Sequence, residues 1–451
     1  MATTTRTQEL FKKASQYSMG TLGDIGDTID VIVERGEGCY IWDTNGKKYL
    51  DICAVTQSLN LGYGRKEIHR AVAEQLAKVE FVCPFRGFTS DVQIEYQGAL
   101  AQVTPKNIKR FIFGTSGTEP VELAIQLAKF YWGLKGKPTK YKVICLDKAY
   151  HGSSLMTSSL TYPPMRNYYG PEAPGVVRIP NYHCYRCAFG LTYPDCGIKC
   201  AHFLEHVIEQ EGEDSVACFI AEPVIGAGGC IAPPPEYFPI VAKACKKHDV
   251  LYINDEVMTG FCRTGKMFAI EHWNAEADMM TMAKGIAATY IPMAGIGVSE
   301  EMYEVLKGTH FAHGHSFSGH PVACAAAKAT LDIYIKEQIA EHVAEVGKYT
   351  KERLEKQFLP LPNVGDISGL GLLLGIGIVA DKETKAEFPK ELDIFGRLRE
   401  QHLRAGLFGR FYGFVDRLYF TPPLTITKEE IDKALDLIYP MVAGLKELKV
   451  K

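Results

Sequence analysis

Short apolar runs in the middle of the sequence are followed at once by side chains that could do chemistry. Lys284 follows the run 279–283, and Asp255 follows the run 251–254. An apolar run can desolvate a lysine and favour its neutral amine, which condenses with an aldehyde to a Schiff base. A carboxylate can keep the nitrogen of an aromatic ring protonated, so that the ring withdraws electrons. The pair therefore points to chemistry on an aromatic aldehyde.

Other groups at the ends of apolar runs would hold such a molecule if it carried a phosphate. We expect Ser116, Gly117 and Thr118 at the phosphate, Tyr150 and Val257 on the two ring faces, and His151 and Glu222 at two further strand ends. The N–H groups of a helix start, together with hydroxyl groups, suit a phosphate. Taken singly, each feature is equally an ordinary turn, cap or packed side chain. Taken together with the lysine and the aspartate, they predict pyridoxal phosphate (PLP) as the cofactor.

Length, charge and hydropathy narrow the class of protein. The 451 residues allow about two or three cores at roughly 150 residues each. Lys and Arg number 50 against 53 Asp and Glu, without a long like-charge block, so we expect no nucleic-acid partner. The most apolar stretch, 369–380, is shorter than the roughly 20 residues of a membrane helix. Because the N-terminus lacks a signal-peptide core, we expect a cytoplasmic protein that acts on small molecules and not at a membrane.

The alternation of apolar runs with helical stretches predicts an α/β fold. We expect strands at 110–113, 142–146, 217–221, 251–254, 279–282 and 294–298. Runs of this kind form a mostly parallel sheet, and ligands bind at the carboxyl ends of its strands. An Asp-Thr-Asn-Gly turn predicts a hairpin within 38–50, and a capping box of Thr427 and Glu430 predicts a helix start.

The same pattern predicts how the chain is divided. Residues 66–325 would form a large PLP-binding domain with a cysteine-rich loop at 181–201. Residues 326–451 would form a smaller α+β domain with strands within 364–379 and at 417–420. The N-terminal segment 1–65 would join this smaller domain, which is then built from both ends of the chain.

In their order, the motifs at the strand ends resemble those of the class III aminotransferases, the ω or subgroup II family of PLP-dependent enzymes of fold type I. The motifs are Thr115–Glu119, Tyr150–Gly152, Glu222-Pro223, Asp255–Phe261, Arg263–Gly265, Lys284-Gly285 and Ser318–Pro321, within about residues 38–440. The resemblance implies a homodimer or a dimer of dimers with the active site at the subunit interface. It implies that Ser316 and Phe317 of the partner subunit lie at the cofactor phosphate, and that Glu222 supports the pocket around Asp255. Met258 departs from the family, because many members carry there a glutamine that reaches the ring hydroxyl.

The resemblance also implies an aminotransferase with Lys284, Asp255 and Tyr150 in its catalytic centre. Lys284 would be the general base at the amine-bearing carbon, and an amine donor and a keto-acid acceptor would react in turn, by a ping-pong mechanism. The same fold and the same lysine could instead racemise or epimerise an amino acid without a second substrate. That isomerase is the alternative function.

Four positions bear on the choice of substrate. Members of the family that use 2-oxoglutarate commonly carry an arginine where this chain has Ser368, so pyruvate is favoured as the acceptor. Arg410 and Arg417, which precede Pro422-Pro423, are the candidates for binding a carboxylate. The amine side would be lined by Gln57, Phe85 and Tyr150. Gln57 replaces an aromatic residue of amine transaminases, which suggests a polar substrate such as an ω-amino acid.

Four cysteines stand outside the family core. Cys184, Cys187, Cys196 and Cys200 have the spacing C-x2-C-x8-C-x3-C. Four thiolates at such spacing can surround a tetrahedral Zn²⁺, but unligated thiols or two disulfides fit the sequence as well. A catalytic metal is not expected, because four thiolates leave no open position for a substrate. We therefore assign no metal to the active site.

Overall fold

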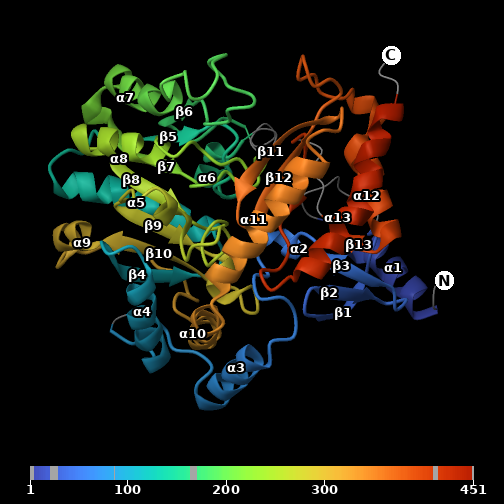
Figure 1. Cartoon of the computed structure of the whole chain (residues 1–451). Helices are drawn as coiled ribbons and strands as arrows, with labels where there is room; N and C mark the ends of the chain where they lie inside the picture. The colour runs from blue at the N-terminus through green and yellow to red at the C-terminus, as the bar shows by residue number, and fades with distance from the viewer. Residues whose placement is uncertain (1–4, 21–28, 86, 163–169, 410–414, 449–451) are drawn as a thin grey trace.

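The computed structural model describes residues 5–20, 29–85, 87–162, 170–409 and 415–448. Its largest sheet has seven strands in the order β4-β10-β9-β8-β7-β5-β6 (Figure 1). The strands are β4 (Ile108–Gly114), β5 (Lys142–Leu146), β6 (Val176–Ile179), β7 (Val216–Ala221), β8 (Leu251–Asp255), β9 (Met279–Met282) and β10 (Ala294–Ser299). Strands β5 to β9 pair in parallel, whereas β10 is antiparallel to both β4 and β9. This is the mostly parallel α/β sheet that the sequence predicts.

Helices cover both faces of this sheet because its central strands are buried on both sides. The helices α7 (Lys199–Glu211) and α8 (Tyr237–Lys247) pack on one face, and α5 (Thr118–Leu134) packs on the other. The bounds of the other helices around the sheet are α3 (Lys66–Lys78), α4 (Asp91–Val103), α6 (Leu155–Leu160), α9 (Glu300–Leu306) and α10 (Pro321–Lys336). The carboxyl ends of the parallel strands therefore remain the open edge at which side chains can meet.

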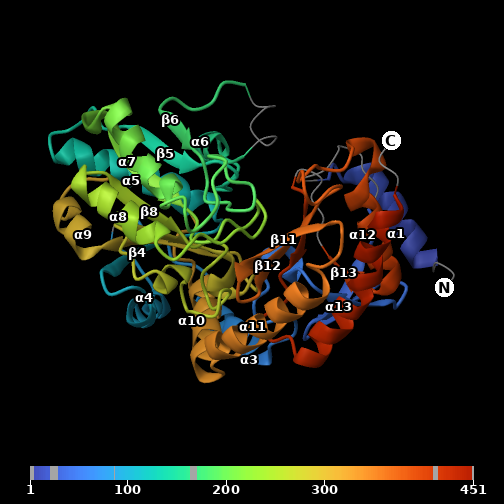
Figure 2. The same ribbon diagram turned by 45° about the horizontal axis from the view of Figure 1, so that its top comes forward.

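Both ends of the chain meet in a second region beside the large sheet (Figure 2). Its strands are β1 (Val33–Glu37), β2 (Tyr40–Asp43), β3 (Lys48–Asp51), β11 (Val364–Leu370), β12 (Leu373–Ile378), β13 (Leu407–Phe408) and β14 (Arg417–Phe420). They form two sheets, β1-β2-β3-β13 and β11-β12-β14. Because β13 pairs in parallel with β3, the C-terminal part of the chain extends the N-terminal hairpin.

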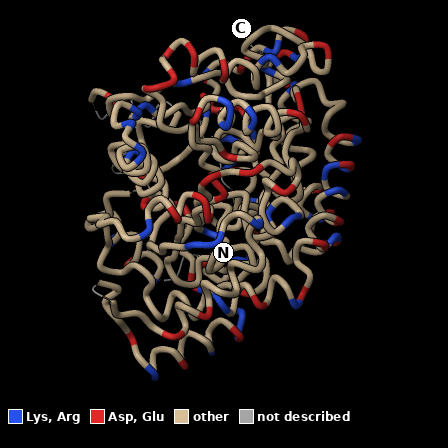
Figure 3. Tube along the Cα trace, turned by 90° about the vertical axis from the view of Figure 1, so that its left-hand side faces the viewer, with Lys and Arg blue, Asp and Glu red and all other residues tan. Residues whose placement is uncertain are grey.

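The remaining helices are short or belong to this second region. They are α1 (Thr5–Tyr17), α2 (Ala54–Gln57), α11 (Ile339–Gln357), α12 (Ile394–Ala405) and α13 (Lys428–Ala443), with 3₁₀ turns at Glu213–Ser215, Ala269–His272, Lys284–Ala287, Lys390–Leu392 and Gly444–Glu447. In the described parts of the chain, no helix is long and apolar enough to cross a membrane. Figure 3 shows acidic and basic residues interspersed along the trace.

The predicted elements are present with small shifts of their ends. All six predicted strands of the large sheet are confirmed, and so is the hairpin β2–β3. The capping box is confirmed, because Glu430 N donates to Thr427 Oγ1 and Thr427 N donates to Glu430 Oε2. The edge strand β6 was missed, since only its last residue is fully buried and its apolar signal is weak. The limits of the three predicted segments stay predictions.

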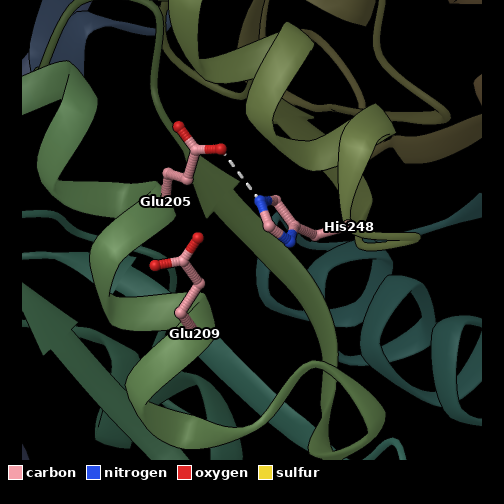
Figure 4. A group of neighbouring side chains, drawn as sticks. All are labelled: Glu205, Glu209 and His248. Atoms are coloured by element: carbon pink, nitrogen blue, oxygen red, sulfur yellow. Dashed lines mark hydrogen bonds and ion pairs between the residues drawn. The ribbon is translucent and has the colours of Figure 1, made fainter.

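A buried histidine ties α7 to the turn that precedes β8 (Figure 4). His248 Nδ1 lies 2.7 Å from Glu213 Oε1, and His248 Nε2 lies 3.0 Å from Glu205 Oε1. The hydrogen bonds to Glu205 and Glu213 raise the pKa of His248. Glu209 brings a further carboxylate within 4.8 Å, but both ring nitrogens are already bonded and Lys247 Nζ lies 2.6 Å from Glu205. We therefore interpret this group as a set of ion pairs and not as a metal site.

Replacing His248 by Gln should destabilise the protein near pH 6 and much less at pH 9. Because the folded-state pKa is raised, the stabilisation is complete below the unfolded-state pKa of about 6.5 and is lost as the pH rises through the folded-state pKa. Hydrogen bonds to charged groups of this kind contribute roughly 1.5 kcal/mol. The urea midpoint of unfolding at the two pH values measures the effect, with the exposed His310→Gln variant as control. Equal destabilisation at both pH values would contradict the ion-pair interpretation.

Candidate active site

The strand ends converge on a cavity of about 380 Å³. Its described lining is Thr56, Ser58, Thr115, Ser116, Gly117, Thr118, Tyr150, His151, Gly152, Asp255, Val257, Ala283, Lys284, Thr289, Ile291, Pro292 and Met293. The structure thus brings together eight of the residues that the sequence predicts around a cofactor: Ser116, Gly117, Thr118, Tyr150, His151, Asp255, Val257 and Lys284. This volume lies within the range of small-molecule sites, roughly 300–1,000 Å³.

Asp255 lies at the end of β8 and is held by three partners. His151 Nδ1 lies 2.6 Å from Asp255 Oδ2, while Thr281 Oγ1 donates to Asp255 Oδ1 at 3.0 Å and Val257 N donates to the same oxygen at 3.1 Å. Asp255 and His151 are each about 2% exposed. The carboxylate is therefore fixed in direction at the wall of the cavity. Sequence reasoning missed Thr281, although the register of β8 with β9 places it directly opposite Asp255.

Lys284 follows β9 and begins a 3₁₀ turn in a left-handed conformation, with φ of 47°. A residue with a Cβ rarely adopts this conformation, and such strain gathers at functional sites. The turn is fixed from outside, because the buried Tyr334 Oη donates to the Gly285 carbonyl at 2.8 Å. Lys284 is thus presented to the cavity from a constrained backbone.

The start of α5 forms the other end of the cavity. Gly117 is the residue before this helix, and a Cβ added there would lie 2.9 Å from a methyl group of Val257. Thr118 Oγ1 accepts a hydrogen bond from Ser153 N at 3.3 Å. Small residues, backbone N–H groups and hydroxyl groups at a helix start are the donor set that suits a phosphate. Glycine is needed here because the chain approaches Val257 so closely.

Glu222 is buried behind the cavity and supports the segment that carries Tyr150. Its Oε1 accepts from Tyr150 N at 2.9 Å, and its Oε2 accepts from Gly226 N at 2.9 Å. Burial raises the pKa of Glu222 to about 7, with the electrostatic effect of His151 acting in the opposite direction. Glu222 is absent from the described lining, so it acts through the backbone of its neighbours. Met258 is buried as well, and its sulfur packs against Gly226.

Of the residues predicted for the substrate, Tyr150 lines the described cavity, whereas Gln57, Phe85 and Arg417 do not. Gln57 is buried, with Nε2 making no hydrogen bond, while its neighbours Thr56 and Ser58 line the cavity instead. Phe85 is 42% exposed and packs against Gly314. Arg417 lines a separate cavity of about 620 Å³, where its Nη1 donates to Asp366 Oδ1 at 2.7 Å. Arg410 lies outside the described residues.

Two further predicted positions lie elsewhere on this chain. Ser316 and Phe317 are exposed and are not part of the described lining, so their role at the phosphate of the partner subunit stays a prediction. Sequence reasoning also missed one wall of the cavity, which comes from Thr289 and the segment 291–293. This wall follows a 3₁₀ turn and has no periodic pattern that could have indicated it.

Comparison with known protein families identifies the family to which the chain with this site belongs. The family model described as "Aminotransferase class-III" matches residues 24–442. The chain belongs to the class III aminotransferases. The enzyme is similar to a putrescine–pyruvate aminotransferase of Pseudomonas aeruginosa, at 36% identity over 90% of this chain and 89% of that protein. It is also similar to a γ-aminobutyrate transaminase of Oryza sativa subsp. indica, at 35% identity over 91% and 81% of the two chains.

Solved structures show the same fold for this aminotransferase. An (S)-enantioselective ω-transaminase of Thermomicrobium roseum has a TM-score of 0.93 and 36% identity, over 97% of this chain and 98% of that one. An amine transaminase of an uncultivated Pseudomonas species, solved with PLP bound, has a TM-score of 0.90 and 29% identity, over 95% and 98% of the chains. The fold is therefore fold type I, and PLP is the cofactor of the aminotransferase.

The described residues fit this cofactor at both ends. The hydroxyl groups and the start of α5 suit its phosphate, and the fixed carboxylate of Asp255 suits its ring nitrogen. Val257 and Tyr150 also line the cavity, and their contact with the two faces of the ring stays a prediction. Lys284 lines the same cavity, and its bond to the cofactor aldehyde stays a prediction. The choice of amine donor and keto-acid acceptor depends on residues other than those that fit the cofactor.

Proposed function

We propose that this aminotransferase moves an amino group from an amine or ω-amino acid to a keto acid with one carboxylate, pyruvate in preference to 2-oxoglutarate, by a ping-pong mechanism. One observation carries the proposal. Among the described residues that line the cavity, Lys284 is the only lysine or arginine. A carboxylate is held best by a bidentate arginine, and 2-oxoglutarate has two carboxylates to hold.

The surroundings support an acceptor with a single carboxylate. Ser368 occupies the position of the family's 2-oxoglutarate arginine, and its hydroxyl accepts a hydrogen bond from Ala232 N at 3.2 Å. Arg417 is committed to Asp366 and to the Gly375 carbonyl. Arg410 is then the remaining candidate, among the arginines predicted from the sequence, for binding the single carboxylate of the acceptor. The similarity to a putrescine–pyruvate aminotransferase points in the same direction.

The amine side of the cavity favours a polar donor. Thr56, Ser58 and Thr289 each bring a hydroxyl-bearing side chain to the lining. Hydroxyl groups can donate to or accept from a polar tail of the substrate, whereas a purely aromatic wall could not. An ω-amino acid or a polar amine therefore suits this wall better than a bulky aromatic amine.

Lys284 and Asp255 have different roles in the proposed reaction. Bound PLP supplies an electrophilic carbon for the amine and a ring that accepts the electron pair released at the amine-bearing carbon. Lys284 Nζ would take the proton from that carbon and return it elsewhere, as a general base and then a general acid. Asp255, directed by His151 and Thr281, would hold the ring nitrogen in its cationic form. The donor's product leaves before the acceptor binds, because both use the same cavity.

We also propose the two-chain arrangement that the family implies. It is supported by exposed apolar side chains at the predicted partner contact, since Phe317 is 59% exposed and packs edge-on against Phe81, which is 42% exposed. Apolar surface of this kind favours association with a second chain. Sedimentation velocity measures the mass of the assembly, and a monomer would contradict this arrangement.

The choice of acceptor is tested in two half-reactions. The PLP-loaded enzyme is first converted by an excess of ω-amino acid, the donor is removed, and each keto acid is then offered while the cofactor's absorbance is followed. Pyruvate should restore the original spectrum about 10- to 100-fold faster than 2-oxoglutarate, because a missing charged hydrogen bond costs roughly 1.5–3 kcal/mol. Faster restoration by 2-oxoglutarate would contradict the proposal.

Two controls sharpen this experiment. Arg410→Ala should slow the reaction of pyruvate more than that of a donor without a carboxylate, whereas the exposed Arg404→Ala should change neither. A single-enantiomer amino acid incubated without any keto acid tests the isomerase alternative. Racemisation in that sample would favour the isomerase, which the relatives named above do not support because they are transaminases.

A further inference from the structure

The four-cysteine loop joins β6 to α7 and lies outside the active-site cavity. We define it by Cys184, Cys187, Cys196 and Cys200. All four of these residues line one cavity of about 20 Å³. A single water-sized sphere needs roughly 10–15 Å³, so the space between the cysteines suits one small ligand and not a larger group. Two pairs of thiols with 8 residues between them in sequence thus face the same small volume.

The backbone places each pair on a tight turn. The first pair encloses Tyr185 and Arg186, which form a turn, and the second pair ends in the first turn of α7. Between the cysteines of the second pair, Gly197 and Ile198 both have left-handed φ values, 56° and 52°. A β-branched residue rarely adopts this conformation without a constraint from its surroundings. The turn that brings Cys196 back toward Cys200 is therefore one that a bound ion would help to hold.

The charges around the loop suit an anionic centre. Four thiolates around a divalent cation carry a net charge of −2, which needs compensation when partly buried. Lys199 lines the same cavity, and Arg186 lies within the first turn. Cys200 stands at the N-terminal end of α7, where the helix dipole favours negative charge. Phe189, Leu191 and Ile198 add an apolar wall to the cavity.

We propose that the four-cysteine loop binds one Zn²⁺ in a structural, tetrahedral site of four thiolates. The Zn–S distance of about 2.3 Å places neighbouring sulfurs about 3.8 Å apart. No three of these thiols lie within 4.8 Å of one another in the structure, so the side chains must rotate inward as the ion binds. Binding releases the thiol protons to solvent and involves no change of oxidation state.

Zinc suits the loop better than the other possibilities. Cys184, Cys187, Cys196 and Cys200 form no disulfide with one another in the structure. An iron–sulfur cluster also uses four cysteines, but it needs more room than a cavity of about 20 Å³ offers. Zinc takes four thiolates in a closed site, which is the arrangement the two pairs can provide.

The metal would fix a contact between the large sheet and the β11–β12 sheet. Tyr185, inside the first cysteine pair, lies so close to Gly365 that a Cβ there would be 2.4 Å from its hydroxyl oxygen. Lys385 Nζ donates to the Tyr185 carbonyl at 2.7 Å, and Arg186 lies 3.9 Å from Glu387. The turn enclosed by two zinc ligands is therefore the one that touches the C-terminal part of the chain.

Metal analysis of the purified holoenzyme tests the proposal. We expect about one zinc ion per chain by inductively coupled plasma mass spectrometry, and an at least roughly tenfold lower content in Cys196→Ser. Cys83→Ser is the matched control, because Cys83 is an exposed cysteine outside the loop, and its zinc content should equal that of the wild type. PLP content, measured on the same samples, shows whether each variant is folded.

A second measurement on the unaltered protein covers the case in which Cys196→Ser fails to fold. Titration of the native holoenzyme with a mercurial reagent should release zinc in proportion to the thiols modified, and a metal-sensitive dye detects the release. Substitution by Co²⁺ should give the intense visible bands of tetrahedral cobalt thiolate. Protein without zinc, disulfides found among the four cysteines by mass spectrometry, or iron with labile sulfide would each overturn the proposal.

Discussion

Replacing Lys284 by Ala is expected to lower kcat by roughly 10⁴-fold or more, because the variant loses the group that we propose as the base at the amine-bearing carbon. PLP should still bind, since its phosphate and its ring nitrogen are held by other residues that line the cavity. Steady-state transamination and the PLP content of the purified variant measure the two effects separately. Added methylamine should restore part of the activity, because a small amine can enter the space that the side chain leaves.

Lys348→Ala provides the control for this experiment. Lys348 lies on α11 with a side chain that is 79% exposed, and it should keep the activity of the wild type. Borohydride reduction of the wild type followed by mass spectrometry should place the reduced cofactor adduct on Lys284. Undiminished turnover of Lys284→Ala, or an adduct on another lysine, would remove the proposed base.

The strands and their ends could be predicted because burial on both faces leaves a clear signal. Runs rich in apolar residues, such as 251–254 and 279–283, are typical of strands buried on both faces, and the polar residue after each run is then expected at the sheet edge. Asp255 and Lys284 were found in this way. Thr281 was missed because it lies within the apolar run 279–283. Its position opposite Asp255 follows only from the register of β9 with β8.

The substrate side could not be predicted to the same depth, because it is built from irregular backbone. Ala54, Val55 and Gln57 all have left-handed φ values, 45°, 62° and 56°, without a glycine in the sequence to indicate them. These conformations turn Gln57 into the protein interior and leave Thr56 and Ser58 on the cavity wall. A residue-by-residue comparison with the family predicts the position of Gln57 but not the direction of its side chain.

Arg417 is one of the two candidates, with Arg410, that the sequence offers for binding a carboxylate, whereas the structure gives it a different partner. The side chain of Arg417 is 5% exposed and pairs with Asp366, which itself lies 3.6 Å from His183 Nε2. The guanidinium group and His183 lower the pKa of Asp366 to about 2, against the effect of burial. Sequence spacing cannot distinguish such a structural ion pair from a substrate ligand, since both require an arginine near the same strand.

The second large effect concerns Asp255. Asp255→Asn should lower kcat by roughly 10²- to 10³-fold, because the amide keeps the size of the side chain but loses the negative charge that faces the cofactor ring. Thr281→Val should cost only about fivefold, since it removes one neutral hydrogen bond to Asp255 of roughly 1 kcal/mol and leaves the charge in place.

Comparison of Asp255→Asn with Thr281→Val distinguishes the effect of the negative charge of Asp255 from the effect of its position. If Asp255 acts through its charge, Asp255→Asn should change the pH dependence of the bound cofactor's absorbance, whereas Thr281→Val should leave that profile in place and lower only the rate. Both variants should keep their PLP, because the phosphate end of the cavity is intact. Equal losses of rate in the two variants, with unchanged pH profiles, would mean that Asp255 only shapes the cavity, and the role given to its carboxylate would have to be withdrawn.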